Sequence, residues 1–154
     1  MSETHNRPPV VAGENTCWLP RSPRSPGIAR GLLRELLGEV AGGHRFADAG
    51  LLVVSELVTN AVAHGTPRER LVWLSLAVDA ARLRIEVHDA RGDRLPVLRG
   101  TDGADESGRG LLLVKSLSLR WGCCPRQNVG KIVWVEVGPG VEAPAPATGG
   151  RRRE

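Results

Sequence analysis

The sequence predicts a two-layer α/β sandwich, in which a mixed, mostly antiparallel sheet is covered on one face by about three helices. Apolar or alternating segments come in adjacent pairs, which is typical of antiparallel strands joined by short turns. These pairs are residues 71–78 with 83–89, and 120–124 with 131–137. Apolar residues at helical spacing predict three helices. Those helices cover residues 27–40, 47–64 and 110–119.

Each remaining element has a local justification. A short strand at residues 16–19 precedes a loop at 20–26, where repeated prolines remove backbone donors. The helix 27–40 carries leucines three and four residues apart and ends at a Gly-Gly pair. The helix 47–64 stops at a Gly-Thr-Pro sequence. Residues 90–107 hold several glycines and no sustained period, so we expect a long loop there.

Length and composition indicate one soluble domain. The 154 residues divide into a flexible N-terminus at 1–15, a folded domain at 16–138 and a disordered tail at 139–154. We see no signal peptide and no apolar run long enough to span a bilayer, so we expect a cytoplasmic protein with no membrane contact. The net charge of +4 comes without an aromatic-interleaved basic platform, so we expect no direct binding of nucleic acid. A basic nucleic-acid binder stays open as a third class of function, resting on charge alone.

The helix 47–64 carries the first candidate site. Glu56 and Asn60 are four residues apart and therefore share one polar stripe, about 40° apart around the helix axis. Val54, Leu57 and Val58 fall on the opposite side and can pack into the core. An amide oxygen suits Mg²⁺ beside phosphate oxygens, and a carboxylate one turn away can orient an attacking hydroxyl. A solvated polar stripe is the alternative interpretation.

A glycine-rich turn before the helix 110–119 is the second candidate site. Ser107 is a plausible N-cap, and Gly108 and Gly110 allow close approach of the backbone to a ligand. Free N–H groups at a helix start attract phosphate, and Arg109 can add a charge-assisted contact. A plain glycine-rich turn is the alternative. The third candidate, Asp89, ends a strand and can accept a hydrogen bond from the amine of adenine, although a turn-initiating Asp is the plainer reading.

Taken in this order, the three motifs resemble those of the Bergerat-fold ATPases, the superfamily of gyrase and the histidine kinases. The segment ELVTNAVAHG is similar to the N-box, VHDARGDRLP to the first glycine box and ESGRGLLLV to the second. More narrowly, the chain resembles the bacterial anti-sigma factor serine/threonine kinases. The resemblance covers residues 17–137 and includes a closing hairpin, LRWGCCPRQNVGKIVWVEV.

The resemblance implies a role for each residue that matches a motif. Glu56 would be the general base, and Asn60 would bind Mg²⁺. Asp89 would contact the adenine amine, within a first glycine box that includes Gly92. The phosphates of ATP would be held by a single run of residues, namely Gly108, Arg109, Gly110 and Leu111.

The resemblance also implies the partners and the activity. Such a protein binds a sigma factor and phosphorylates a serine on a STAS-domain anti-anti-sigma protein, and it commonly forms a homodimer. Two departures favour an alternative, a module that captures these partners without transferring phosphate. Arg91 stands where the first glycine box usually has glycine, and Ile132 lacks the hydroxyl that helps to bind adenine through water.

Overall fold

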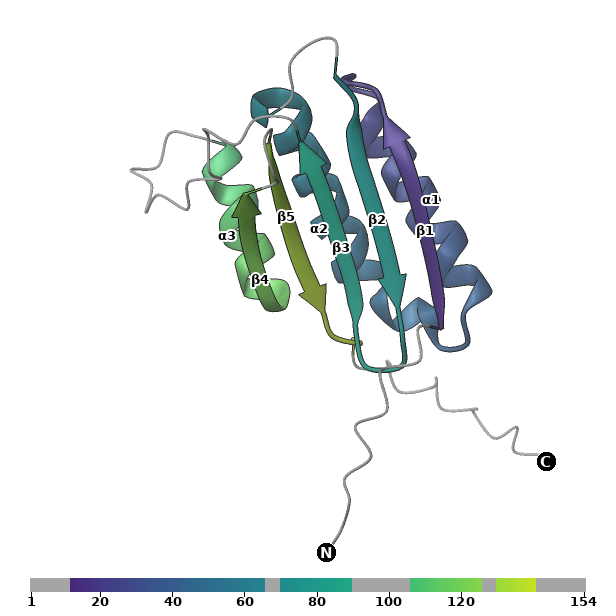
Figure 1. Ribbon diagram of the computed structural model, residues 1–154. Coiled ribbons are helices and arrows are strands. Elements are labelled where there is room, and N and C mark those ends of the chain that lie inside the picture. The colour runs from purple at the N-terminus through teal and green to yellow at the C-terminus, as the bar shows by residue number, and fades with distance from the viewer. Residues whose placement is uncertain (1–11, 66–69, 90–105, 126–129, 141–154) are drawn as a thin grey trace, which may run out of the picture.

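The computed structural model describes residues 12–65, 70–89, 106–125 and 130–140. Five strands form one sheet in the order β1-β2-β3-β5-β4, and each described neighbouring pair is antiparallel (Figure 1). The strands are β1 (Gly13–Leu19), β2 (Val72–Val78), β3 (Leu83–Asp89), β4 (Ser118–Pro125) and β5 (Lys131–Val137). The predicted pairings of β2 with β3 and of β4 with β5 are therefore confirmed.

The three main helices lie on one face of this sheet (Figure 1), as the two-layer prediction requires. They are α1 (Ser25–Glu39), α2 (Ala47–Asn60) and α3 (Glu106–Leu117). Two short helical turns flank α2, the 3₁₀-helix η1 (Gly43–Phe46) and the π-helix η2 (Ala61–Gly65). The expected helix over residues 47–64 is thus an α-helix that changes to π geometry directly after Asn60.

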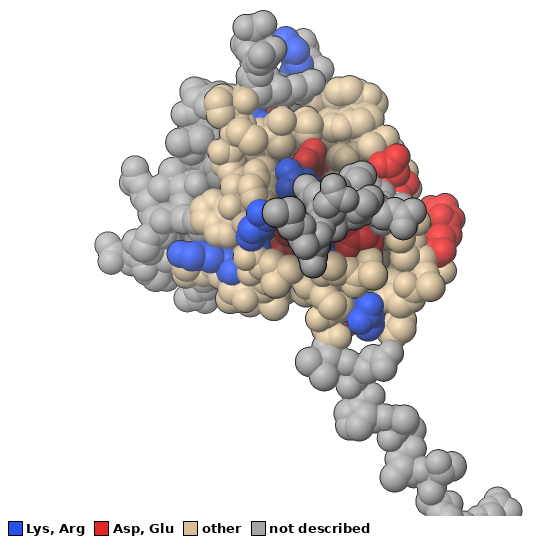
Figure 2. All heavy atoms as spheres, turned by 60° about the horizontal axis from the view of Figure 1, so that its bottom comes forward, with Lys and Arg blue, Asp and Glu red and all other residues tan. Residues whose placement is uncertain are grey.

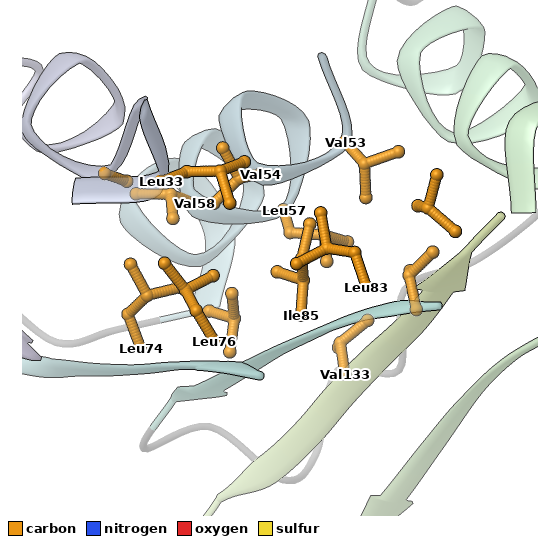
Figure 3. Close-up of a cluster of buried hydrophobic side chains, with 14 of the residues drawn as sticks. Leu33, Val53, Val54, Leu57, Val58, Leu74, Leu76, Leu83, Ile85 and Val133 are labelled. Atoms are coloured by element: carbon orange, nitrogen blue, oxygen red, sulfur yellow. The ribbon is translucent and has the colours of Figure 1, made fainter. Parts of the chain in front are cut away.

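The core lies between the helices and the sheet (Figure 3). Leu33 of α1 and Leu57 of α2 belong to the same buried cluster as Leu74 of β2 and Ile85 of β3. In β2 and β3 every second side chain is buried, which is the pattern of a sheet with one covered face. Each such aliphatic side chain contributes about 1.5–3 kcal/mol relative to exposure, so this layer supplies most of the driving force for folding.

The helix α2 is the most apolar of the three main helices. The stretch Gly43–His64 is long and apolar enough to cross a membrane by length and composition alone. This finding differs from the expectation that no apolar run has the necessary length. Val54 and Val58, however, are completely buried against the rest of the protein, so their apolarity is explained by the core.

The opposite face of the sheet carries a cluster of charged and aromatic side chains. Glu136 of β5 is almost completely buried there and accepts bonds from Arg120 at 2.9 Å, Arg84 at 3.1 Å and Arg82 at 3.4 Å. Arg84 also lies over the ring of Trp134, 4.5 Å from its centroid. Burial opposes the ionisation of Glu136, but the hydrogen bond and charge of Arg120, helped by the other two guanidinium groups, outweigh it and lower its pKa.

Charge is mixed on the side of the molecule seen in Figure 2. Acidic and basic side chains both appear there, with uncharged surface between them, and they do not separate into one basic field. Sequence-independent binding of nucleic acid depends on a continuous positive surface. This face of the described residues gives no support to the nucleic-acid hypothesis.

Candidate functional site

The candidate motifs meet at one edge of the sheet. In Figure 1 the end of β3, the start of β5, the start of α3 and the end of α2 all lie at the upper edge. The helix α2 packs against β3, β5 and α3, and η2 continues this contact along β3. Segments about fifty residues apart in the sequence are therefore neighbours in the fold, as a shared site requires.

Glu56 and Asn60 lie one turn apart on α2, and both are half-buried. Leu57 and Val58, between them in sequence, are buried in the core, so the predicted division of this helix into a polar and an apolar side is confirmed. The π-helix η2 begins immediately after Asn60, and Arg21 donates to the carbonyl of Val62 at 3.0 Å. Single turns of π-helix are frequent at functional sites, because they change the direction of the side chains that follow.

The change of helix type after Asn60 also affects His64. His64 follows Asn60 by four residues and would continue the stripe in an α-helix. It lies in η2 instead, where a turn takes more residues, and its side chain is exposed. Glu56 and Asn60 therefore make up the candidate pair without His64.

Gly110 of α3 lies directly against the carboxyl group of Glu56. A Cβ atom at Gly110 would come within 2.7 Å of Glu56 Cδ and still closer to Oε2, which is nearer than real Cβ atoms approach. The buried position of Gly110 can therefore hold only glycine without a shift of Glu56 or α3. The first two motifs, separated in the sequence, are in van der Waals contact here.

The start of α3 differs from the prediction. The helix begins at Glu106, so Ser107 lies within its first turn and is not the N-cap. The N–H groups of the first three residues of a helix have no intrahelical partners, and here they belong to residues 106–108. Gly108 is among these donors, whereas Arg109 and Gly110 fall just beyond them. The side chains of Arg109 and Leu111, together with the whole of Arg91 and Gly92, lie outside the described residues.

Asp89 is buried at the end of β3, with 2% of its surface exposed. Its cross-strand neighbour is Lys131, the first residue of β5, and Lys131 Nζ lies 3.4 Å from Asp89 Oδ2. Gly130, just before it, has a φ of 113°, a value that favours glycine and sets the entry into the strand. Sequence reasoning missed Lys131, because it considered the next residue, Ile132, as the neighbour of the base. The register pairs Ile132 with His88 instead.

The donor set indicates how a metal would be held. Among the described residues no group of three or more His, Cys, Asp or Glu side chains could hold a metal ion. An all-protein cage is therefore absent from this part of the chain. Mg²⁺ usually keeps several waters and takes few protein ligands beside the phosphates of a nucleotide. A single amide oxygen from Asn60 fits that manner of binding.

Comparison with known families agrees with this architecture. The profile of the family described as the histidine kinase-like ATPase domain matches residues 19–136, which include the three main helices, β2, β3, β4 and nearly all of β5, but only the last residue of β1. The chain belongs to this family. Its five-stranded antiparallel sheet with helices on one side is the α/β Bergerat ATPase fold that the sequence predicts. ATPase domains of this class generally bind ATP with Mg²⁺.

Two individual proteins are similar to parts of the chain. The glycerol-3-phosphate dehydrogenase [NAD(P)+] of Deinococcus radiodurans is 39% identical over 101 residues, which are 64% of this chain. The chain spans only 29% of that relative's length. A solved histidine kinase domain, from the blue-light activated histidine kinase of Erythrobacter litoralis EL346, is 24% identical, with a TM-score of 0.41. That likeness covers 62% of this chain and 45% of the other, and the family assignment does not depend on it.

Proposed function

We propose that this protein is an ATP-dependent serine/threonine kinase of the bacterial cytoplasm, which phosphorylates a STAS-domain anti-anti-sigma protein and regulates a sigma factor. One observation carries the proposal, the contact between Glu56 and Gly110 at the start of α3. It puts a carboxylate beside the helix start whose N–H groups attract phosphate. The anti-sigma part rests on the resemblance of the three motifs to that class of kinase.

In the proposed reaction, each candidate residue at this edge of the sheet has one role. Asp89 accepts a hydrogen bond from the adenine amine, and the start of α3 faces the phosphates. Glu56 accepts the hydroxyl proton of the substrate serine while the serine oxygen forms a bond to the γ-phosphorus. The bond from that phosphorus to the bridging oxygen breaks, and ADP leaves. Mg²⁺, held by Asn60 and the phosphates, would neutralise the charge that develops on the transferred group.

The partners follow from the same proposal. A sigma factor and a STAS-domain protein are both expected to bind, and a homodimer is part of the expectation. The net charge of +4 favours acidic partners over basic ones during encounter. A dehydrogenase activity is not proposed, because dinucleotide-binding folds use a mostly parallel sheet, whereas the described strand pairs are all antiparallel.

A second candidate function is capture of the same partners without phosphate transfer. Two features favour it. The carboxylate of Asp89 is already engaged by Lys131, so a base must share it. In addition, Arg91 replaces a glycine of the first glycine box. Either feature would weaken the binding of ATP without affecting a protein-binding surface.

Labelled ATP and a cognate STAS protein separate the two candidates. The wild type should transfer phosphate to serine, and Glu56→Gln should bind ATP but transfer at least 100-fold more slowly. Asn60→Ala should lose the Mg²⁺-dependent part of ATP binding. Glu35→Gln, an exposed change of the same type on α1, is the control and should behave as the wild type. Undiminished transfer by Glu56→Gln would refute the role of that carboxylate, and capture without transfer by the wild type would favour the second candidate.

A further inference from the structure

The ion pair between Asp89 and Lys131 lies where the base of the nucleotide is expected. Both side chains are less than a tenth exposed, and both stand at the ends of neighbouring strands, directly opposite each other. The pair therefore offers a hydrogen-bond acceptor and a donor side by side, 3.4 Å apart. A ligand that reaches Asp89 at this edge meets the ammonium group of Lys131 as well.

Stability alone does not explain this pair. Removing two opposite charges from water costs about as much as their attraction returns, and well-packed apolar pairs are often equally stable. The neighbouring core position of the same strands, Val87 with Val133, shows that apolar residues fit this ladder. The chain also has only two lysines, Lys115 and Lys131, among 21 basic residues. A compact ammonium has thus been placed at the one position opposite Asp89, in a chain that otherwise uses arginine.

We propose that Lys131 reads the base directly, donating a hydrogen bond to the ring nitrogen N1 of adenine while Asp89 accepts one from the adjacent amine. This inference rests on the proposed binding of ATP. An ammonium group carries three N–H donors, so it can serve N1 as well as the carboxylate. Lys131 would then help to bind adenine, as the hydroxyl that Ile132 lacks would otherwise do. The register supports this exchange, because Lys131 lies opposite Asp89 whereas Ile132 lies opposite His88.

The same pair selects against guanine. Adenine presents an amine donor beside the acceptor N1, which matches the acceptor of Asp89 beside the donor of Lys131. Guanine presents a carbonyl oxygen beside an N–H group, so in the same pose acceptor would face acceptor and donor would face donor. A site with buried polar groups rejects a ligand that leaves them unpaired.

Calorimetric titration of the wild type with modified nucleotides tests the proposal without any change to the protein. In 1-deaza-ATP a carbon replaces N1, so its dissociation constant should be about tenfold or more above that of ATP, the loss expected for a bond to a charged donor. In 7-deaza-ATP the change lies away from this edge, and it should bind as ATP does. GTP should bind at least as weakly as 1-deaza-ATP.

Two further measurements assign the effect to Lys131. The variant Lys131→Met should bind ATP and 1-deaza-ATP equally well, whereas Lys115→Met, an exposed change of the same type on α3, should keep the difference. If Lys131→Met does not fold, ¹⁵N-lysine labelling of the wild type serves instead, since only two side-chain signals arise. The Lys131 signal should shift with ATP and shift much less with 1-deaza-ATP.

The outcomes separate this inference from the proposed function. Equal binding of ATP and 1-deaza-ATP by the wild type would overturn the role of Lys131 and leave ATP binding intact. Tighter binding of ATP by Lys131→Met than by the wild type would also overturn it, because Lys131 would then compete with the base for Asp89. Failure of the folded wild type to bind ATP would overturn both.

Discussion

The contact between Gly110 and Glu56 gives a sharp prediction for Gly110→Ala. The added methyl would lie 2.7 Å from Glu56 Cδ and 3.4 Å from Oε1, with Oε2 closer still. Gly110 is buried on α3, whereas the clashing atoms belong to the carboxyl end of the flexible, half-buried Glu56 side chain, so this side chain can turn away. We therefore expect the carboxyl group of Glu56 to be displaced at the point where phosphate is proposed to bind.

The magnitude follows from two opposing effects. Overpacking by one methyl costs about 1–3 kcal/mol of folding free energy. Replacing a helical glycine by alanine returns about 1 kcal/mol. Gly31→Ala on α1 isolates the second effect, because a Cβ at Gly31 meets no atom within 4 Å. Because the flexible carboxyl group can turn away, the lower end of the overpacking range applies: we expect Gly110→Ala to be about 1 kcal/mol less stable than Gly31→Ala, a difference of roughly 2–4 °C in Tm for a chain of this size.

Urea unfolding of a double-mutant cycle locates the clash. Glu56→Ala removes the carboxyl group that the new methyl would strike. In that background Gly110→Ala should lose most of its penalty, giving a coupling energy of about 1 kcal/mol between the two positions. In the otherwise unchanged protein, the displacement should also slow phosphate transfer by about 100-fold. An equal penalty with and without the Glu56 side chain would refute the contact on which the site is built.

Two further predictions concern the buried charges of the sheet. The lowered pKa of Glu136 means that its charge stabilises the fold above the unfolded value, about 4.3, and that this stability is lost as pH falls through the folded value. The urea midpoint of the wild type should therefore fall more steeply on acidification below about pH 5 than that of Glu136→Gln, and parallel curves would contradict this. Lys131→Met removes one charge of the buried ion pair with Asp89 and should cost about 3–5 kcal/mol, of which Lys131→Met/Asp89→Asn should recover most. Differential scanning calorimetry checks the second prediction, and no recovery would refute it.

The parts of the fold that were predicted correctly depend on local patterns. The spacing of Val54, Leu57 and Val58 predicts the apolar side of α2. These residues are buried because an amphipathic helix packs its apolar side against the core. The strands β3 and β5 agree with the expected ranges to the residue, since alternation with a period of two is visible in seven residues. Such signals need no knowledge of the rest of the chain.

The parts that were not predicted depend on contacts between distant segments. Glycine lowers helix propensity, so the sequence favoured a turn at Gly108 and Gly110, but packing of α3 on α2 extends the helix back to Glu106. The π-helix after Asn60 likewise has no local signature in composition. The pairing of Asp89 with Lys131 is a matter of register between strands 42 residues apart in sequence, and a shift of one residue would have put Ile132 there.

The helix α2 connects two parts of the proposed site, the residues that would bind adenine and the residues near the phosphates. This helix contacts β3 and β5, which carry Asp89 and Lys131, and also α3, which carries Gly110. Changes at Asp89 or Lys131 alter groups that would bind adenine equally in the ground state and the transition state. They should therefore change the affinity for ATP and leave the rate of phosphate transfer unchanged. Changes at Glu56 or Gly110 alter groups near the transferred phosphate and should change the rate. A substitution that displaced α2 itself would change the affinity and the rate together, because α2 contacts both parts of the proposed site.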